Sequence, residues 1–180
     1  VLYVGQKFFF VEDQINIAQT SGKRAVQLKN RTPCVGICST TYGDLVCRGC
    51  KRFSHEIVQW NGYDKDQQGL IWERLTNLRN EVLEHLLVRI DAARYLAACC
   101  EASLDDLDPN EQRYQLLRCM VRDNKCLNEA GLATSADFVP PISPNSNPNQ
   151  TDTLTVLQAL DAETYRRSKA HYERNFKVPL

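Results

Sequence analysis

Four cysteines, Cys34, Cys38, Cys47 and Cys50, lie within seventeen residues of this 180-residue chain. Thiols this close together serve in proteins as disulfides, metal ligands or redox pairs. Here they form two pairs, with three residues inside the first, two inside the second and eight between them. Two separated pairs are typical of a tetrahedral metal site, whereas disulfide frameworks belong mostly to short secreted chains rich in loops. The spacing therefore predicts a metal site whose ligands are these four side chains.

The residues around the cysteines predict the fold of this module. Between the pairs, the sequence TTYGDL contains a Gly-Asp turn flanked by strand-forming residues, which predicts a short β-hairpin. After the second pair, the sequence KRFSHEIVQW places Phe53, Ile57 and Trp60 on one face of a helix. The second pair would then open a helix, where backbone N–H groups and the helix dipole stabilise thiolates. This order predicts a small treble-clef-like metal module over residues 32–62.

The identity of the metal stays open between two choices. Four thiolates bind zinc at about 2.3 Å per sulfur, and they also hold iron-sulfur clusters. Ferredoxin-type spacings place three cysteines in one tight run, and this sequence has no such run. The pattern favours zinc, with an iron-sulfur cluster as the alternative.

The rest of the chain predicts a mostly α protein in which long helices form a hairpin or bundle. Residues 1–31 read as a partly irregular arm, and residues 63–138 as a helical hairpin. Its first helix begins at a capping Asp64 and continues close to Cys100, because apolar residues recur at three- and four-residue steps. At 1.5 Å per residue this helix would reach roughly 50 Å. We therefore expect it to bend, to pack on a second long helix, or to form a homo-oligomer.

The second helix of the hairpin has a clear start. Asp108 is placed to cap it and Pro109 to occupy its first position, while Gly131 is a candidate stop. Residues 139–151 are rich in proline and asparagine and read as a linker. Residues 152–180 then predict a C-terminal helix.

Composition and charge limit the function classes. The 22 basic and 22 acidic residues cancel, which argues against a surface built wholly for nucleic acid or anionic lipid. No apolar run approaches the roughly 18 residues that span a membrane, and no signal-peptide pattern opens the chain, so we expect a cytoplasmic protein. Basic residues gather near the cysteines and predict a face that contacts a protein partner or nucleic acid: Lys29, Arg31, Arg48, Lys51 and Arg52.

The remaining cysteines and histidines give weaker signals. Cys99, Cys100, Cys119 and Cys126 lie in apolar helical patterns, which favours core packing over a second metal site or redox pair. His55 follows the second pair closely, and packing is favoured over a role as substitute ligand. The sequence holds no recognisable catalytic arrangement, so a non-enzymatic role is favoured.

Three stretches, TPCVGIC, CRGCKRFSHEIVQW and QGLIWERL, carry a resemblance to a known family. Together they resemble the small bacterial domain-of-unknown-function family 1289, over about residues 33–75. The resemblance implies a bacterial cytoplasmic protein with a metal held by the four clustered cysteines, and members are described as predicted iron-sulfur proteins. The chain departs from the family in having Lys51 where a glycine is frequent, and in its long helical extension.

These observations favour one function and leave others open. The favoured function is a zinc-binding adaptor or interaction protein with a basic face on the metal module. The alternative is an iron-sulfur protein that serves electron transfer or redox sensing for a partner enzyme. An enzyme formed by the helices is a third, less favoured hypothesis.

Overall fold

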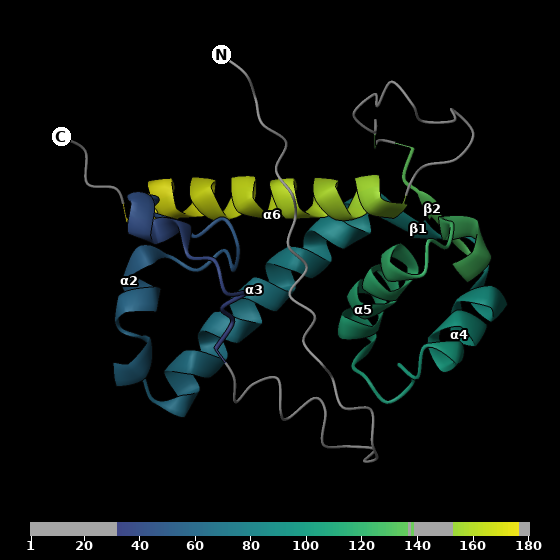
Figure 1. Cartoon of the computed structure of the whole chain (residues 1–180), viewed down its shortest axis with the longest axis horizontal. Helices are drawn as coiled ribbons and strands as arrows, with labels where there is room; N and C mark the ends of the chain where they lie inside the picture. The colour runs from purple at the N-terminus through teal and green to yellow at the C-terminus, as the bar shows by residue number, and fades with distance from the viewer. Residues whose placement is uncertain (1–31, 137, 139–152, 177–180) are drawn as a thin grey trace.

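The computed structural model of the chain describes residues 32–136, 138 and 153–176 (Figure 1). The predicted N-terminal arm, residues 1–31, and the predicted linker, residues 139–151, lie outside the described residues. The described part of the protein is mostly helical, with one small antiparallel sheet. In chain order its elements, in which η marks a 3-10 helix, are η1 (Ser39–Tyr42), α2 (Ser54–Val58), η2 (Trp60–Gly62), α3 (Lys65–Leu86), β1 (Leu87–Arg89), α4 (Ala92–Glu101), α5 (Pro109–Arg122), η3 (Leu127–Ala130), β2 (Leu132–Thr134) and α6 (Thr153–Asn175).

The single long helix predicted from Asp64 to Cys100 is wrong, because α3 ends at Leu86. Leu87 has an extended backbone, with φ −126° and ψ 135°, and begins strand β1, which pairs with β2. The interruption contains β-branched Val88 and Ile90, which favour a strand. Asp91 then caps a new helix, α4, by accepting a hydrogen bond from the Arg94 N–H. Apolar spacing alone did not reveal the break because both helices place apolar residues at three- and four-residue steps.

The helix starts predicted from capping residues are confirmed. The Asp64 carboxylate accepts a 2.8 Å hydrogen bond from the Gln67 N–H, and Asp108 accepts one of 2.9 Å from the Asn110 N–H. Pro109 is the first residue of α5, where its missing N–H costs nothing. The predicted stop at Gly131 ends the short η3 instead of α5.

Gly131 is required where the sheet meets α4. Its φ is +62°, and a Cβ atom built on it would lie 2.2 Å from the Asp91 carbonyl oxygen. Its carbonyl oxygen also accepts hydrogen bonds from the N–H groups of Ile90 and Asp91. A side chain at this position would therefore collide with Asp91 and with Arg94 at the start of α4.

The described part of the chain has two regions joined by two long helices. In Figure 1 the cysteine segment and α2 lie at one end and α4 and α5 at the other, with α3 and α6 running between them. We call residues 32–62 the cysteine module, and residues 82–134 with the first third of α6, Thr153–Leu160, the helical lobe. The main apolar core belongs entirely to the helical lobe: Val82, Leu83, Leu86, Leu87, Tyr95, Cys99, Leu104, Leu116, Leu117, Met120, Leu127, Ala130, Leu132, Val156 and Leu160.

The cysteine module contains less regular structure than predicted. The expected β-hairpin is wrong, because Ser39–Tyr42 form η1 and the chain turns at Gly43 with φ +92°. In this module the strand pairing among the described residues is a single antiparallel bridge between Val46 and Phe53. The following helix is present as the short α2, but these elements do not establish a treble-clef fold.

None of the helices in the described ranges is long and apolar enough to cross a membrane.

Candidate metal centre

The turns that carry the two cysteine pairs lie against each other. Gly49, inside the second pair, packs so closely on the first that an added Cβ would lie 2.6 Å from Val35 Cγ2 and 3.0 Å from the Ile37 carbonyl oxygen. The Cys47 thiol also approaches that carbonyl oxygen, with Sγ at 3.8 Å. The fold therefore brings together the two halves of the predicted site, and Gly49 is the residue that permits the contact.

The second pair is buried, and a hydrogen bond joins its two thiols. Cys47 is 1% exposed and Cys50 is 8% exposed. The Cys50 thiol donates a hydrogen bond that lowers the pKa of Cys47 to about 4, while the same bond and burial raise the pKa of Cys50. The Arg52 Nε–H donates to Cys50 Sγ at 3.4 Å. The hydrogen bond from Cys50 therefore favours the thiolate form of Cys47, the form in which sulfur binds a metal.

The first pair is closer to solvent and makes only local contacts. Cys34 is exposed and its sulfur accepts a hydrogen bond from the Gly36 N–H at 3.4 Å. Cys38 is half-buried, with Sγ 2.9 Å from the Thr40 hydroxyl oxygen. Gly36 has a φ of +95°, a left-handed turn that glycine adopts without strain.

The four sulfurs do not converge on one point. Among the described residues no group of three or more histidine, cysteine, aspartate or glutamate side chains is arranged to hold a metal ion. The donor set itself, four free thiols on two packed turns, has the soft chemistry that zinc and iron-sulfur clusters require. The donor types and the packing of the two turns therefore suit a four-thiolate centre, but the sulfur positions do not, because Cys34 contacts the Gly36 N–H and Cys38 contacts the Thr40 hydroxyl.

The predicted basic face is not present as a face in the described residues. Lys29 and Arg31 lie outside them, and Arg48 is exposed but its Nε donates to Asp44 at 2.9 Å. Lys51 and Arg52 are 8% and 3% exposed, so neither is available to a partner. Both cations interact with groups inside the protein, because a buried charge needs a partner there.

Arg52 stacks inside the module. Its guanidinium lies 4.8 Å from the centroid of the Trp60 ring while its Nε–H donates to Cys50. Trp60 therefore contacts Arg52, the side chain that donates a hydrogen bond to the candidate ligand Cys50.

Lys51 has an unusual backbone conformation for a lysine. Its φ is +61°, in the left-handed region that favours glycine. The turn is therefore tight although the chain has a lysine where the resemblance leads one to expect glycine. Its ammonium group donates to the carbonyl oxygens of Arg48 at 2.7 Å and Gly49 at 3.0 Å, and it pairs with the Asp161 carboxylate of α6.

Sequence reasoning missed the ion pair that supports the start of α2. The buried Glu56 carboxylate accepts a hydrogen bond from the Phe53 N–H and two from Arg74 Nη2, at 2.9 and 2.7 Å. The Arg74 guanidinium also lies 4.0 Å from the centroid of the Phe53 ring. The separation of 18 residues between Glu56 and Arg74 gives no local sequence signal for such a pair.

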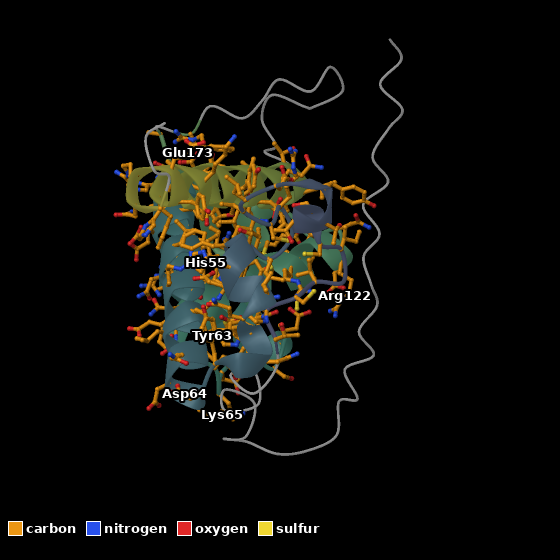
Figure 2. The ribbon with its side chains drawn as sticks, turned by 90° about the vertical axis from the view of Figure 1, so that its left-hand side faces the viewer. His55, Tyr63, Asp64, Lys65, Arg122 and Glu173 are labelled. Atoms are coloured by element: carbon orange, nitrogen blue, oxygen red, sulfur yellow. The ribbon has the colours of Figure 1, made fainter. Side chains whose placement is uncertain are left out.

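An aromatic cluster surrounds Phe53 and was also missed. The rings of His171 and Tyr172 from α6, and of Phe176 directly after it, lie 5.3 to 5.7 Å from the Phe53 ring. His55 joins them, 5.1 Å from Phe176, so its packing role is favoured over ligation. Figure 2 shows His55 between the start of α3, at Asp64 and Lys65, and the helix α6, which carries Glu173. The aromatic positions of α6 were visible in the sequence as apolar spacing, but their partner was not.

The four other cysteines have different environments. Cys99 is 2% exposed and burial raises its pKa, as expected for core packing. Cys100 is exposed, and Cys119 and Cys126 are half-buried, so the prediction of core packing is wrong for Cys100. Cys119 lines a hollow of about 210 Å³ between α4 and α5, smaller than typical ligand pockets of about 300–1,000 Å³.

The comparisons with known proteins concern the cysteine region. No curated protein and no solved structure shows a significant match to the chain. One family model matches residues 32–79, which include all four clustered cysteines, α2 and the first part of α3. Over these residues the chain matches the family described as "Protein of unknown function (DUF1289)", and the resemblance predicted from the cysteine motifs is confirmed.

Proposed function

We propose that the chain is a metal-binding interaction protein in which Cys34, Cys38, Cys47 and Cys50 hold one zinc ion. The observation that carries this proposal is the close contact of the two cysteine turns at Gly49, which brings the two thiol pairs into one neighbourhood. A shared centre would stabilise a tight contact of this kind between irregular turns. Four thiolates around a metal supply one.

Metal binding would change the first pair more than the second. Cys47 and Cys50 are already buried and share a proton, so the second pair needs only to lose it. Cys34 and Cys38 would exchange their contacts with the Gly36 N–H and the Thr40 hydroxyl for the metal. Those contacts lie within two residues of each cysteine, so breaking them leaves the remaining fold in place.

The proposed zinc centre is structural because four protein thiolates leave no open coordination position. Catalytic zinc sites keep one position for water or substrate, whereas structural sites are closed. A closed centre supports a role in binding another macromolecule. Lys51 and Arg52 are buried, so they do not supply the basic contact surface that was predicted for the module.

A second candidate, an iron-sulfur cluster for electron transfer or redox sensing, is favoured by the hydrogen bonds to sulfur. The Gly36 N–H donates to Cys34 and the Arg52 guanidinium donates to Cys50. Hydrogen bonds and positive charge near cluster sulfurs raise the reduction potential. The cluster would use the same four cysteines.

Metal and sulfide analysis separates the two candidates. The protein is purified without oxygen and without a histidine tag, and zinc, iron and acid-labile sulfide are measured together with the visible spectrum. We expect one zinc per chain, no labile sulfide and no colour. Iron with labile sulfide would establish the second candidate, and a chain that retains no stoichiometric metal would contradict both.

Two exposed cysteines provide a matched pair of variants for this assay. Cys34→Ser removes a proposed ligand, and we expect it to reduce the metal content. Cys100→Ser removes a thiol of α4 that is also exposed and should leave the metal content unchanged. Equal metal content in the two variants would show that the assigned ligand set is wrong.

A further inference from the structure

One face of helix α6 covers the segment that carries the second cysteine pair. The residues of this face recur at three- and four-residue steps and so lie on one side of the helix. Each of them contacts the stretch from Arg48 to Phe53: Asp161, Tyr165, Ser168, Tyr172 and Phe176. We call these five residues the α6 face.

Lys51 is the centre of this contact. Its ammonium group pairs with Asp161, and its carbonyl oxygen accepts a 2.9 Å hydrogen bond from the hydroxyl of Ser168, which is 1% exposed. The same ammonium group donates to the carbonyl oxygens of Arg48 and Gly49, the two residues between Cys47 and Cys50. Lys51 therefore joins the inside of the cysteine turn to a helix about 110 residues further along the chain.

Contacts on either side of Lys51 extend the same docking. The Arg48 guanidinium lies 5.5 Å from the centroid of the Tyr165 ring. The rings of His171 and Tyr172 of α6, and of Phe176 directly after it, pack against the Phe53 ring, with Tyr172 in an edge-on arrangement at 5.3 Å. The α6 face thus holds the cysteine turn at its beginning, middle and end.

We propose that α6 is a clamp that positions Cys47 and Cys50 for the metal, with Lys51 as the positioning residue through which it acts. This inference rests on the metal site proposed above. Lys51 does not touch the metal in this arrangement. It fixes the backbone between the two ligands, and groups that orient ligands in this way commonly change metal affinity by about 10- to 100-fold.

The clamp also links the cysteine module to the helical lobe. The first third of α6 buries Val156 and Leu160 in the main core, at 0% and 3% exposure. The rest of the helix, from Asp161 on, carries the contacts to the cysteine turn, and α6 runs from the helical lobe to the cysteine module in Figure 1. A metal bound to the folded module therefore stabilises the docking of α6, and loss of this docking weakens metal retention.

The experiment measures the rate at which zinc leaves the full-length protein when an excess chelator is added. We expect the double variant Asp161→Asn with Ser168→Ala to release zinc at least about tenfold faster than the unmodified protein. Lys51→Gly keeps the left-handed backbone accessible and removes the ammonium group, so it should give a similar acceleration. Far-ultraviolet circular dichroism checks that both variants keep their helices.

Two further variants separate positioning from a general effect on the helix. Glu173→Gln makes the same carboxylate-to-amide change as Asp161→Asn on an exposed position of α6 and should leave the release rate unchanged. Asp161→Glu keeps the negative charge and should restore a rate within about threefold of the unmodified protein. Release at the unmodified rate in both the double variant and Lys51→Gly would overturn the clamp.

Hydrogen exchange distinguishes failure of the clamp from failure of the metal site. The Cys47 N–H donates a hydrogen bond to the Arg52 carbonyl oxygen at 2.9 Å. The Lys51 N–H donates one to the Cys47 carbonyl oxygen, also at 2.9 Å. If the unmodified protein holds no metal, the proposed function fails, yet the clamp still predicts at least tenfold faster exchange of these amides in the double variant. Unchanged exchange in that variant would overturn the clamp independently of metal.

Discussion

The cysteine module and the helical lobe are held together by different kinds of interaction. The lobe buries fifteen residues in one apolar cluster, which extends from Val82 to Leu160. In the module, the buried apolar side chains apart from cysteines are Pro33, Val46 and Phe53, and Lys51, Arg52 and Glu56 are buried beside them. Buried charges stabilise a fold far less than apolar groups of the same size, because their desolvation offsets their attraction.

This difference indicates where each region obtains its stability. The lobe has enough apolar burial to fold by the hydrophobic effect. The module has a few polar links, the packing of α6 on Phe53 and four thiols, so a metal would contribute a large part of its stability. Changes in the lobe should therefore act on global unfolding, and changes at the thiols should act on the module.

The largest expected effect comes from removing a proposed ligand. Cys47→Ser should release the metal and unfold the module, because a structural zinc site supplies roughly 10 kcal/mol to folding. The unfolding should expose Trp60, which is seen as a red shift of its fluorescence in a Trp72→Phe background, where Trp60 is the only indole.

The control for this variant lies in the other region. Cys119→Ser changes a half-buried thiol of the helical lobe and should leave both the metal content and the Trp60 emission unchanged. Loss of metal from Cys119→Ser, or full metal in Cys47→Ser, would contradict the assignment of the thiols.

A core truncation should act on the lobe instead. Leu117 is 0% exposed, and Leu117→Ala should lower the free energy of unfolding by about 2–5 kcal/mol, measured by urea denaturation. Leu70→Ala changes a residue that is 66% exposed and should cost less than about 0.5 kcal/mol. Equal effects of the two substitutions would show that the apolar cluster does not hold the lobe.

A smaller effect is expected from the ion pair of the module. Glu56→Gln weakens the bidentate contact with Arg74 and should destabilise the module by about 1–3 kcal/mol. The destabilisation should appear as faster zinc release and as a red shift of the Trp60 emission. The exposed Glu73→Gln is the matched control, and a Glu56→Gln protein with the same zinc release rate would show that the ion pair does not support the module.

The smallest expected effect concerns Glu163 on α6. Hydrogen bonds from Arg166 and then Arg167 lower its pKa to about 2, from an ordinary value of 4.5. A depressed carboxyl pKa contributes stability above pH 4.5 that is lost as the pH falls through about 2. Nuclear magnetic resonance titration of the carboxyl carbon should show this midpoint, whereas a midpoint near 4.5 would mean that the arginines do not engage it.

Local sequence signals predicted parts of this structure well. The caps at Asp64 and Asp108 and the first position of Pro109 are short-range features, and each lies where it was expected. The C-terminal helix was also predicted from its apolar spacing and is present as α6. The family match over residues 32–79 followed from the cysteine motifs.

Features that depend on distant partners were not predicted. The helix break at Leu87 depends on pairing with β2, more than 40 residues later. The burial of Lys51 depends on Asp161 and Ser168, so its charge alone suggested an exposed contact. The predicted basic face shows that basic residues near a motif do not establish a charged surface, because Lys51 and Arg52 are buried.

X-ray absorption at the metal edge of the purified full-length protein tests the proposed centre most directly. Four sulfur neighbours at about 2.3 Å around zinc are expected, with one sulfur lost in Cys34→Ser if that variant retains metal. A metal surrounded by nitrogen or oxygen, or the same four-sulfur shell in Cys34→Ser, would contradict a centre built from the two cysteine turns.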